Sequence, residues 1–330
     1  MLELVHKEYK GLDIMKFVMA IVVVAIHTRP EMSFASPFIK RLFESVYSLA
    51  VPFFFMTSGF LLFRKISLPL NEDGEQRIRT YLKRICRLYL VWTVIYLPLT
   101  VYGFYIDGLS LLKAIAIFFR NILLVGENFM SWPLWYLLAL IVAVSIIYLL
   151  LKIKVSKTWI VIISVLMAFV GVGLNYCQDH KLLEPVVDVY FKIFLNTRNG
   201  FFVGLMFVSL GMLCARLENV AWSTWFCILV LGTVGMILQY SLFNAPMTFA
   251  LCVLTISLRT RNIYSGFATL MRTMSTVVYF THMIFMAILV LGVDINKGLI
   301  LFAIVTLLSI GLALMIQFFR NSSLFKMCFE

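Results

Sequence analysis

Two ionisable side chains, Lys16 and His27, lie inside the first long apolar segment of the sequence, GLDIMKFVMAIVVVAIHTRP. They are 11 residues apart, so on a helix they share nearly the same face, about 16 Å apart along the axis. An ionisable group inside a membrane segment costs on the order of 3 kcal/mol, and one that is retained usually has a function. We therefore expect a functional stripe on this face. Lys16 can alternatively pair with Asp13 or extend its ammonium to the cytoplasmic surface.

Histidine is the side chain best suited to proton transfer at physiological pH, because its ordinary pKa is about 6.5. His27 is therefore a candidate general base, although a histidine at the membrane interface can also simply bond to a loop. A second intramembrane histidine, His282, lies in MRTMSTVVYFTHMIFM, with Ser275 and Tyr279 on the same face. It is either catalytic or bonded to a neighbouring helix. The four histidines include no pair with metal-ligand spacing, so no metal site is expected.

Two arginines, Arg84 and Arg87, stand at i, i+3 in YLKRICRLYLVW, where a third membrane segment begins. Guanidinium groups on one helix face can bind phosphate bidentately, as a nucleotide-bearing donor such as coenzyme A requires. Taken by themselves, the two arginines are explained first by cytoplasmic anchoring. Lys16 is expected near the same depth and could join them.

An acidic residue, Glu127, precedes an aromatic belt in GENFMSWPLWYLLAL. Aromatic belts are typical of a membrane interface. Glu127 can orient or activate His27 from the outer side, or it can be a solvated loop carboxylate.

The composition shows which elements must position these groups. Of the 330 residues, 62% are hydrophobic and 13% charged, against about 25% charged in soluble domains. We predict an all-α polytopic bundle of about ten transmembrane helices around a cavity, as a single membrane domain over residues 1–330. The expected spans are 11–28, 44–63, 85–106, 132–151, 158–176, 200–215, 222–243, 246–258, 268–292 and 298–319. Residues 109–125 are expected to form an amphipathic interfacial helix or a partial crossing.

The basic residues predict the orientation. Of the 28 Lys and Arg residues, 18 fall on the side that holds both termini and nine on the other, with Lys16 between them. This bias places both termini in the cytoplasm. Because the positive charges do not gather on one soluble face, nucleic acid is not an expected partner, whereas the lipid bilayer is. The six cysteines are scattered, with neither disulfide nor metal spacing.

In order, these motifs resemble the acyltransferase-3 family of integral membrane acyltransferases. The resemblance consists of a basic residue separated by ten residues from a first-span histidine, PFFFMTSGFLLF, Arg-x-x-Arg entering the third span, PLWYLLAL, and Ser-x3-Tyr-x2-His near the end. It covers about residues 10–320.

The family resemblance implies an O-acyltransferase of the bacterial cytoplasmic membrane that moves acetyl from acetyl-coenzyme A to a hydroxyl of a cell-envelope sugar or glycan. His27 would be the base, and Arg84 and Arg87 would bind the donor. Lys16 stands where the family usually has Arg, which keeps the charge but loses the bidentate fork. An acyl-enzyme route through Ser275 or Ser58 is a weaker alternative.

The segments KFVMAIVVVAIHTRP and AVPFFFMTSGFLLF are also similar to the membrane half of vancomycin-resistance serine racemases. That similarity implies a different class of function, a transport or binding module for a small amino acid such as serine, with charged groups near mid-membrane. Arg84 and Arg87 separate the two hypotheses, because a serine site has no use for a phosphate clamp.

Overall fold

The structure is a computed structural model that describes residues 9–214, 221–238, 243–258 and 263–329. These residues form helices and no β-strand, which confirms the all-α class. The α-helices are α1 (Lys10–Thr28), α2 (Pro37–Phe63), α3 (Glu72–Ile95), α4 (Leu97–Ile106), α5 (Leu111–Arg120), α6 (Trp135–Lys152), α7 (Lys157–Asp179), α8 (Glu184–Phe194), α9 (Leu205–Leu213), α10 (Trp222–Ile237), α11 (Asn244–Ser257), α12 (Ser265–Ala287), α13 (Leu299–Gln317) and α14 (Ser323–Phe329).

Five short segments of tighter or wider helix connect or extend these helices. Two are 3-10 helices, η1 (Pro30–Ser33) and η3 (Trp132–Leu134). Three are π-helices, η2 (Asn121–Val125), η4 (Gly200–Gly204) and η7 (Ile288–Gly292). Residues 109–125 thus form α5 followed by a π turn, and α5 presents apolar side chains to its surroundings, with Leu111 and Leu112 77% and 81% exposed.

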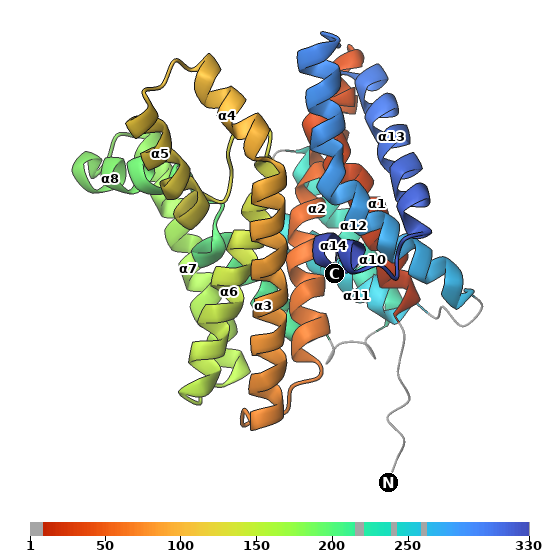
Figure 1. Cartoon of the computed structure of the whole chain (residues 1–330). Coiled ribbons are helices and arrows are strands. Elements are labelled where there is room, and N and C mark those ends of the chain that lie inside the picture. Colours follow the sequence, from red (N-terminus) through yellow and green to blue (C-terminus); the bar gives the residue numbers. More distant parts are fainter. Residues whose placement is uncertain (1–8, 215–220, 239–242, 259–262, 330) are drawn as a thin grey trace. The chain divides into compact units, whose positions relative to one another are not determined.

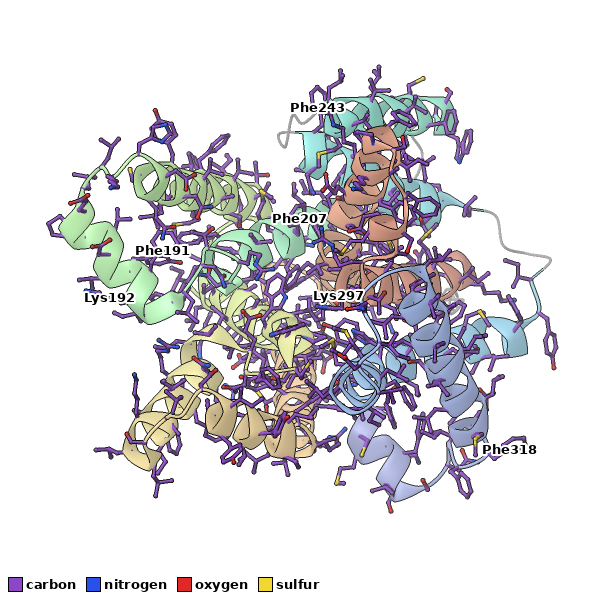
Figure 2. The ribbon with its side chains drawn as sticks, turned by 90° about the horizontal axis from the view of Figure 1, so that it is seen from above. Phe191, Lys192, Phe207, Phe243, Lys297 and Phe318 are labelled. Atoms are coloured by element: carbon purple, nitrogen blue, oxygen red, sulfur yellow. The ribbon has the colours of Figure 1, made fainter. Side chains whose placement is uncertain are left out.

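Helices form at all ten expected positions, but fewer than ten of them are long and apolar enough to be counted as membrane spans. Six segments of the described chain qualify: Lys10–Thr28, Pro37–Phe63, Trp132–Lys152, Lys157–Asp179, Ser265–Gly292 and Leu299–Gln317. Helices α3 and α4 form a seventh when taken together, and Gly200–Leu213, α10 and α11 are shorter apolar helices. The chain is a multi-pass membrane protein by these criteria. Many of its exposed side chains are apolar, as a lipid-facing surface requires; Phe318, just after α13, projects outward and is 89% exposed (Figure 2).

Two of the expected span boundaries need correction. Helix α2 begins at Pro37 rather than at residue 44, and α3 begins at Glu72 rather than at residue 85, because Asn71 caps it by accepting a hydrogen bond from the Gly74 amide at 2.9 Å. The expected third span is also bent by 50° between α3 and α4. Pro98 explains the bend, since it lacks the amide hydrogen that a continuous helix would use.

The described chain divides into two compact units, which are described separately. The first contains residues up to Phe54, 216–286 and 294–319, and the second contains 55–215, 287–293 and 320–330. The division does not follow the order of the sequence, because each unit takes segments from distant parts of the chain.

In the first unit, α1 and α12 run parallel. Three contacts occur in the same order along both helices: Lys10 Nζ donates to the Ile263 carbonyl at 2.6 Å, Asp13 binds Arg272, and His27 meets His282. Helix α13 runs the opposite way to α1, since the Gly298 amide just before it donates to the carbonyl of Thr28 at 2.8 Å.

A tight helical hairpin, α10 and α11, also belongs to the first unit (Figure 1). A Cβ atom at Gly232 would lie 2.7 Å from Met247 Cβ, and one at Gly235 would lie 2.4 Å from the Phe243 ring. The pairing order, 232 with 247 and 235 with 243, makes the two helices antiparallel. The glycines permit this close approach.

The second unit is built around α3, α6, α7 and α9, with α3 and α6 side by side (Figure 1). The end of α2 crosses α9 with almost no space between the backbones. A Cβ atom at Gly59 would lie 2.1 Å from the Val208 carbonyl oxygen, and one at Gly211 would lie 2.1 Å from that of Met56. Ser58-Gly59, in the PFFFMTSGFLLF motif, thus serves helix packing in this unit, and the Ser58 hydroxyl bonds to the Tyr136 hydroxyl at 3.0 Å.

Candidate functional site

The structure brings the two intramembrane histidines together in the first unit. His27 comes from the last turn of α1 and His282 from α12. Their ring centroids are 5.4 Å apart and their planes are inclined by 31°. His27 is half-buried and His282 is fully buried. This pairing was not predicted from the sequence, from which His27 and His282 were identified as two separate candidates.

The hydrogen bonding of His282 defines which of its nitrogens can accept a proton. Nδ1 lies 3.0 Å from the Val278 carbonyl oxygen; because a carbonyl only accepts, Nδ1 carries the hydrogen and Nε2 carries the lone pair. Nε2 is buried and has no hydrogen-bond partner among the described residues. A buried acceptor without a donor costs about 1–3 kcal/mol, so this nitrogen is available for a proton or a hydroxyl group.

An ion pair fixes the two helices that carry the histidines. Arg272 on α12 binds Asp13 on α1 with two parallel hydrogen bonds, Nε to Oδ1 at 3.0 Å and Nη2 to Oδ2 at 2.6 Å. The Asp13 side chain is 10% exposed and the Arg272 side chain 58%. Bidentate pairs of this kind fix geometry as well as adding energy. Lys16, one turn after Asp13, is half-buried on α1.

A carboxylate that sequence reasoning missed lies just beyond His27. Glu31 is 2% exposed; it accepts hydrogen bonds from Arg29 Nε and from the Tyr47 hydroxyl, both at 2.5 Å. Arg29 itself is in the left-handed region at φ 57°, so the chain turns sharply at the end of α1. The one sequence signal for this network is an acidic residue placed immediately after a membrane segment, in HTRPEM.

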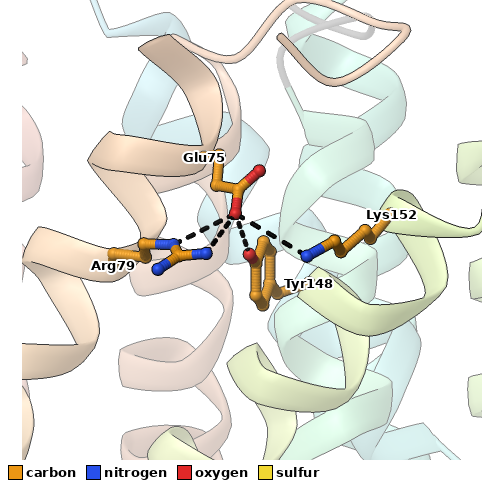
Figure 3. Close-up of polar contacts among 4 residues, drawn as sticks. All are labelled: Glu75, Arg79, Tyr148 and Lys152. Carbon is orange, nitrogen blue, oxygen red and sulfur yellow. Dashed lines mark hydrogen bonds and ion pairs between the residues drawn. The ribbon is translucent and has the colours of Figure 1, made fainter. Parts of the chain in front are cut away.

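The predicted donor-binding arginines, Arg84 and Arg87, lie in the second unit. Both are exposed on α3. A polar cluster near the start of α3 ties that helix to α6 (Figure 3). In it, Glu75 accepts two hydrogen bonds from Arg79, at 2.5 and 3.1 Å, and one from the Tyr148 hydroxyl, with Lys152 Nζ at 3.9 Å. Arg84 and Arg87 therefore lie on a helix whose first turns, predicted to be cytoplasmic, are held against α6 by this cluster.

Glu127 also lies in the second unit, in the segment between η2 and η3. Its side chain is 20% exposed, and its nearest charged partner is Arg198, with Nη2 4.0 Å from Oε1. Burial raises the pKa of the Glu127 carboxyl, and the Arg198 charge partly opposes that rise. The Arg198 guanidinium lies 5.6 Å from the centre of the Trp135 ring.

Two predicted contacts join residues of different units and stay predictions. These are the action of Glu127 on His27 and the participation of Lys16 in the site of Arg84 and Arg87. Among the residues that the structure describes, no group of three His, Cys, Asp or Glu side chains could hold a metal ion.

The fold and site define a class of protein: a helical, multi-pass membrane protein with a pair of histidines inside its first unit. Comparison with known proteins gives the family. The acyltransferase-3 family model, described as an acyltransferase domain, matches residues 9–318, and the chain belongs to that family.

Two kinds of curated relative are also similar over part of the chain. An amino-acid racemase from Enterococcus faecalis is 30% identical over 214 residues, which is 63% of this chain and 29% of the racemase. A serine/alanine racemase from Enterococcus gallinarum is 29% identical over 216 residues, again 63% of this chain and 29% of the relative. The matched part is thus less than a third of these relatives' length. No solved structure matches significantly.

Proposed function

We propose that this chain is an integral membrane O-acyltransferase of the bacterial cytoplasmic membrane. It would transfer acetyl from cytoplasmic acetyl-coenzyme A to a hydroxyl of a cell-envelope sugar, glycan or related acceptor. The observation that carries the proposal is the His27–His282 pair, in which a half-buried imidazole lies beside a buried one with an available nitrogen lone pair. Family membership supports the reaction class.

The proposed chemistry assigns the two histidines different roles. In the reaction, His282 Nε2 would accept a hydrogen bond from an N–H of His27, which would hold the His27 ring in one tautomer with its other nitrogen acting as base. Ring centroids 5.4 Å apart allow this contact, directly or through one hydroxyl. His27 then takes the proton of the acceptor hydroxyl as its oxygen attacks the thioester carbonyl. The C–O bond forms, the C–S bond breaks, and the proton passes to the coenzyme A thiolate. General-base catalysis of this kind is worth about 10²–10⁴ in rate.

The donor is proposed to bind through its phosphates. Arg84 and Arg87 present two exposed guanidinium groups from one face of α3, and Lys16 would add a third positive charge. Because Lys16 lies about 16 Å from His27 along α1, the pantetheine arm of the donor must reach outward along the protein to bring its thioester to the base.

The parallel arrangement of α1 and α12 supports ten crossings with both termini in the cytoplasm. Parallel spans require an odd number of crossings between them, and α2, the bent pair α3–α4, α6 and α7 supply an even number. The antiparallel hairpin α10–α11 adds two crossings or none. The segment Gly200–Leu213 must therefore cross the membrane as well, so that the number of crossings between α1 and α12 is odd. With α1, α12, α13 and the two helices of the hairpin included, the total is ten.

The direct test is binding and turnover of acetyl-coenzyme A by the purified protein in nanodiscs. We expect the wild type to bind the donor and hydrolyse it slowly, His27→Ala to bind without turnover, and Arg84→Ala/Arg87→Ala to lose binding. His180→Ala is the matched control, because His180 is an exposed histidine at the end of α7. A folded wild-type protein that binds no donor contradicts the proposal.

The second candidate function is a binding or transport module for a small amino acid such as serine. The relatives named as amino-acid and serine/alanine racemases favour it. Saturable uptake of labelled serine into proteoliposomes, without any binding of coenzyme A, would support this alternative over the acyltransferase.

A further inference from the structure

Three side chains of the second unit form a site that the proposed chemistry does not use. We define the Glu127–Arg198–Trp135 site by the Glu127 carboxylate, the Arg198 guanidinium 4.0 Å from it, and the Trp135 indole, whose centre is 5.6 Å from that guanidinium. A negative group, a positive group and a half-exposed aromatic ring thus lie within the reach of one small molecule.

Close packing holds both arms of this site against the first turns of α6. Gly126, just before Glu127, has φ +87°, and a Cβ atom there would lie 2.6 Å from the Trp135 Cα. A Cβ atom at Gly200, two residues after Arg198, would lie 2.5 Å from the carbonyl oxygen of Ala139. Only glycine allows the two segments to approach α6 this closely.

Hydrogen bonds between buried amides fix the same two segments. Asn121 donates to the Asn128 side chain at 3.0 Å, and the Ser131 hydroxyl accepts from the Asn128 amide at 2.9 Å. Asn199 accepts from the amide of Phe201 at 3.0 Å and donates to the Tyr190 hydroxyl at 2.8 Å. The neighbours of Glu127 and Arg198 are therefore occupied with one another, and the site is preorganised.

The two charged groups, in contrast, leave most of their hydrogen-bonding capacity to solvent or to a ligand, because Arg198 is 61% exposed and Glu127 20% exposed. Their mutual contact of 4.0 Å is longer than a charge-assisted hydrogen bond of about 2.7–2.9 Å. Among the described residues, the Glu127 carboxylate has no hydrogen-bond donor, although only 20% of its side chain is exposed. A carboxylate can accept about four hydrogen bonds and a guanidinium can donate five. A ligand that supplies donors and acceptors side by side would satisfy both.

The indole beside the charged pair favours a sugar over a small amino acid, because a sugar ring offers an apolar face to Trp135 as well as polar groups to the charged pair. A small amino acid can bridge Glu127 and Arg198 at the same spacing, but it leaves the indole uncovered. Adjacent hydroxyls of a sugar ring can bridge them where they stand, one donating to the carboxylate and the other accepting from the guanidinium. The apolar face of the ring can then pack on exposed indole surface at Trp135.

We infer that the Glu127–Arg198–Trp135 site binds the vicinal hydroxyls of a sugar ring. Sugar binding at this site does not rest on the proposed acyltransferase function, although a sugar is also the class of acceptor proposed there.

The test measures sugar binding without the donor. Saturation-transfer NMR on the full chain in nanodiscs uses methyl β-D-glucopyranoside and methyl N-acetyl-β-D-glucosaminide, with tetrahydropyran-2-methanol, which lacks adjacent hydroxyls, as the comparison ligand. We expect transfer to at least one glycoside and none to the comparison ligand. Glu127→Gln, which is close to isosteric, and Arg198→Gln, which removes the guanidinium group, should each raise Kd about tenfold or more, which corresponds to about 1.4 kcal/mol.

Matched controls remove equivalent charges elsewhere in the same unit. Asp188→Asn and Lys181→Gln change exposed side chains of the 181–188 stretch and should leave the glycoside Kd unchanged. Monodisperse elution of every variant shows that the protein is folded, and Trp135→Leu is added where it passes that check.

Each outcome decides a separate question. Absence of transfer to any glycoside, or equal Kd values in wild type, Glu127→Gln and Arg198→Gln, overturns the inference. Transfer to L-serine instead of the glycosides shows a zwitterion site and also overturns it. Glycoside binding in a protein that neither binds nor turns over acetyl-coenzyme A would refute the proposed function and leave the sugar site standing.

Discussion

The ion pair between Asp13 and Arg272 should respond unequally to removal of its two partners. The Asp13 side chain is 10% exposed, whereas that of Arg272 is 58% exposed. Arg272→Met leaves a buried carboxylate without its two donors, and the methionine keeps most of the apolar stem. Asp13→Asn leaves a guanidinium that water already reaches. The arginine substitution should therefore be the more damaging one.

The structure sets the size of the difference. Removing one partner of a fully buried pair costs about 3–5 kcal/mol, and exposure of the arginine end reduces this to about 2–3 kcal/mol for Arg272→Met. Asp13→Asn should cost about 1 kcal/mol or less, as for an exposed ion pair. In the double variant the carboxylate no longer needs a partner, so its stability should lie close to that of Asp13→Asn rather than at the sum of the two losses.

Apparent melting temperature, measured by fluorescence-detected size exclusion after heating, gives the rank order of these variants. Arg79→Met is the matched control, because Arg79 is 56% exposed and its partner Glu75 keeps a tyrosine hydroxyl as donor; it should lower the melting temperature less than Arg272→Met does. Equal melting temperatures for Arg272→Met and Asp13→Asn would refute the reasoning, since they would show that the carboxylate does not depend on the arginine.

Three further predictions follow from other contacts. Gly211→Ala should destabilise the protein by about 1–3 kcal/mol, because its Cβ atom would lie 2.1 Å from the Met56 carbonyl oxygen; Gly173→Ala, which faces open space, should not lower the melting temperature. The pKa of Glu127 is raised by burial above its ordinary value of 4.5, so the stability gained from its protonated form is present below pH 4.5 and is lost as the pH rises through the folded-state pKa. Glu127→Gln should consequently raise the melting temperature at pH 7.5 and not at pH 4, and a pH-independent difference would contradict this. His282→Phe should raise the melting temperature, because it removes a buried acceptor without a donor, and should lower turnover; loss of stability with full turnover would contradict the role given to Nε2.

The sequence alone predicted the helical class and the places of the helices, because long apolar runs leave few alternatives in a bilayer. The third span was predicted as one continuous segment, and the bend after α3 was missed. The sequence does hold a signal for that bend, since Pro98 cannot continue a helix. The extensions of α2 and α3 were missed for a physical reason. The first turn of α3 is polar and capped, and the early part of α2 carries Lys40, Arg41 and Glu44. A search for apolar windows therefore starts both spans too late.

The candidate site was only partly predictable. Individual groups stood out because ionisable residues are rare in membrane segments, and both His27 and His282 were identified in that way. Their contact joins residues far apart in the sequence, and helical periodicity carries no information about which spans are neighbours. The bidentate partner of Asp13 was missed for the same reason: the local candidate was Lys16, whereas the structure pairs Asp13 with Arg272.

The central claim is that His27 is the base that activates the acceptor, and chemical rescue tests it most directly. Turnover of labelled acetyl-coenzyme A is measured in nanodiscs for wild type, His27→Gly and the control His180→Gly, with and without added imidazole. We predict that His27→Gly loses about 10²–10⁴ in rate and regains part of it when imidazole is added, while His180→Gly behaves as wild type. Turnover by His27→Gly within about threefold of wild type, far smaller than the loss of a general base, would contradict the account.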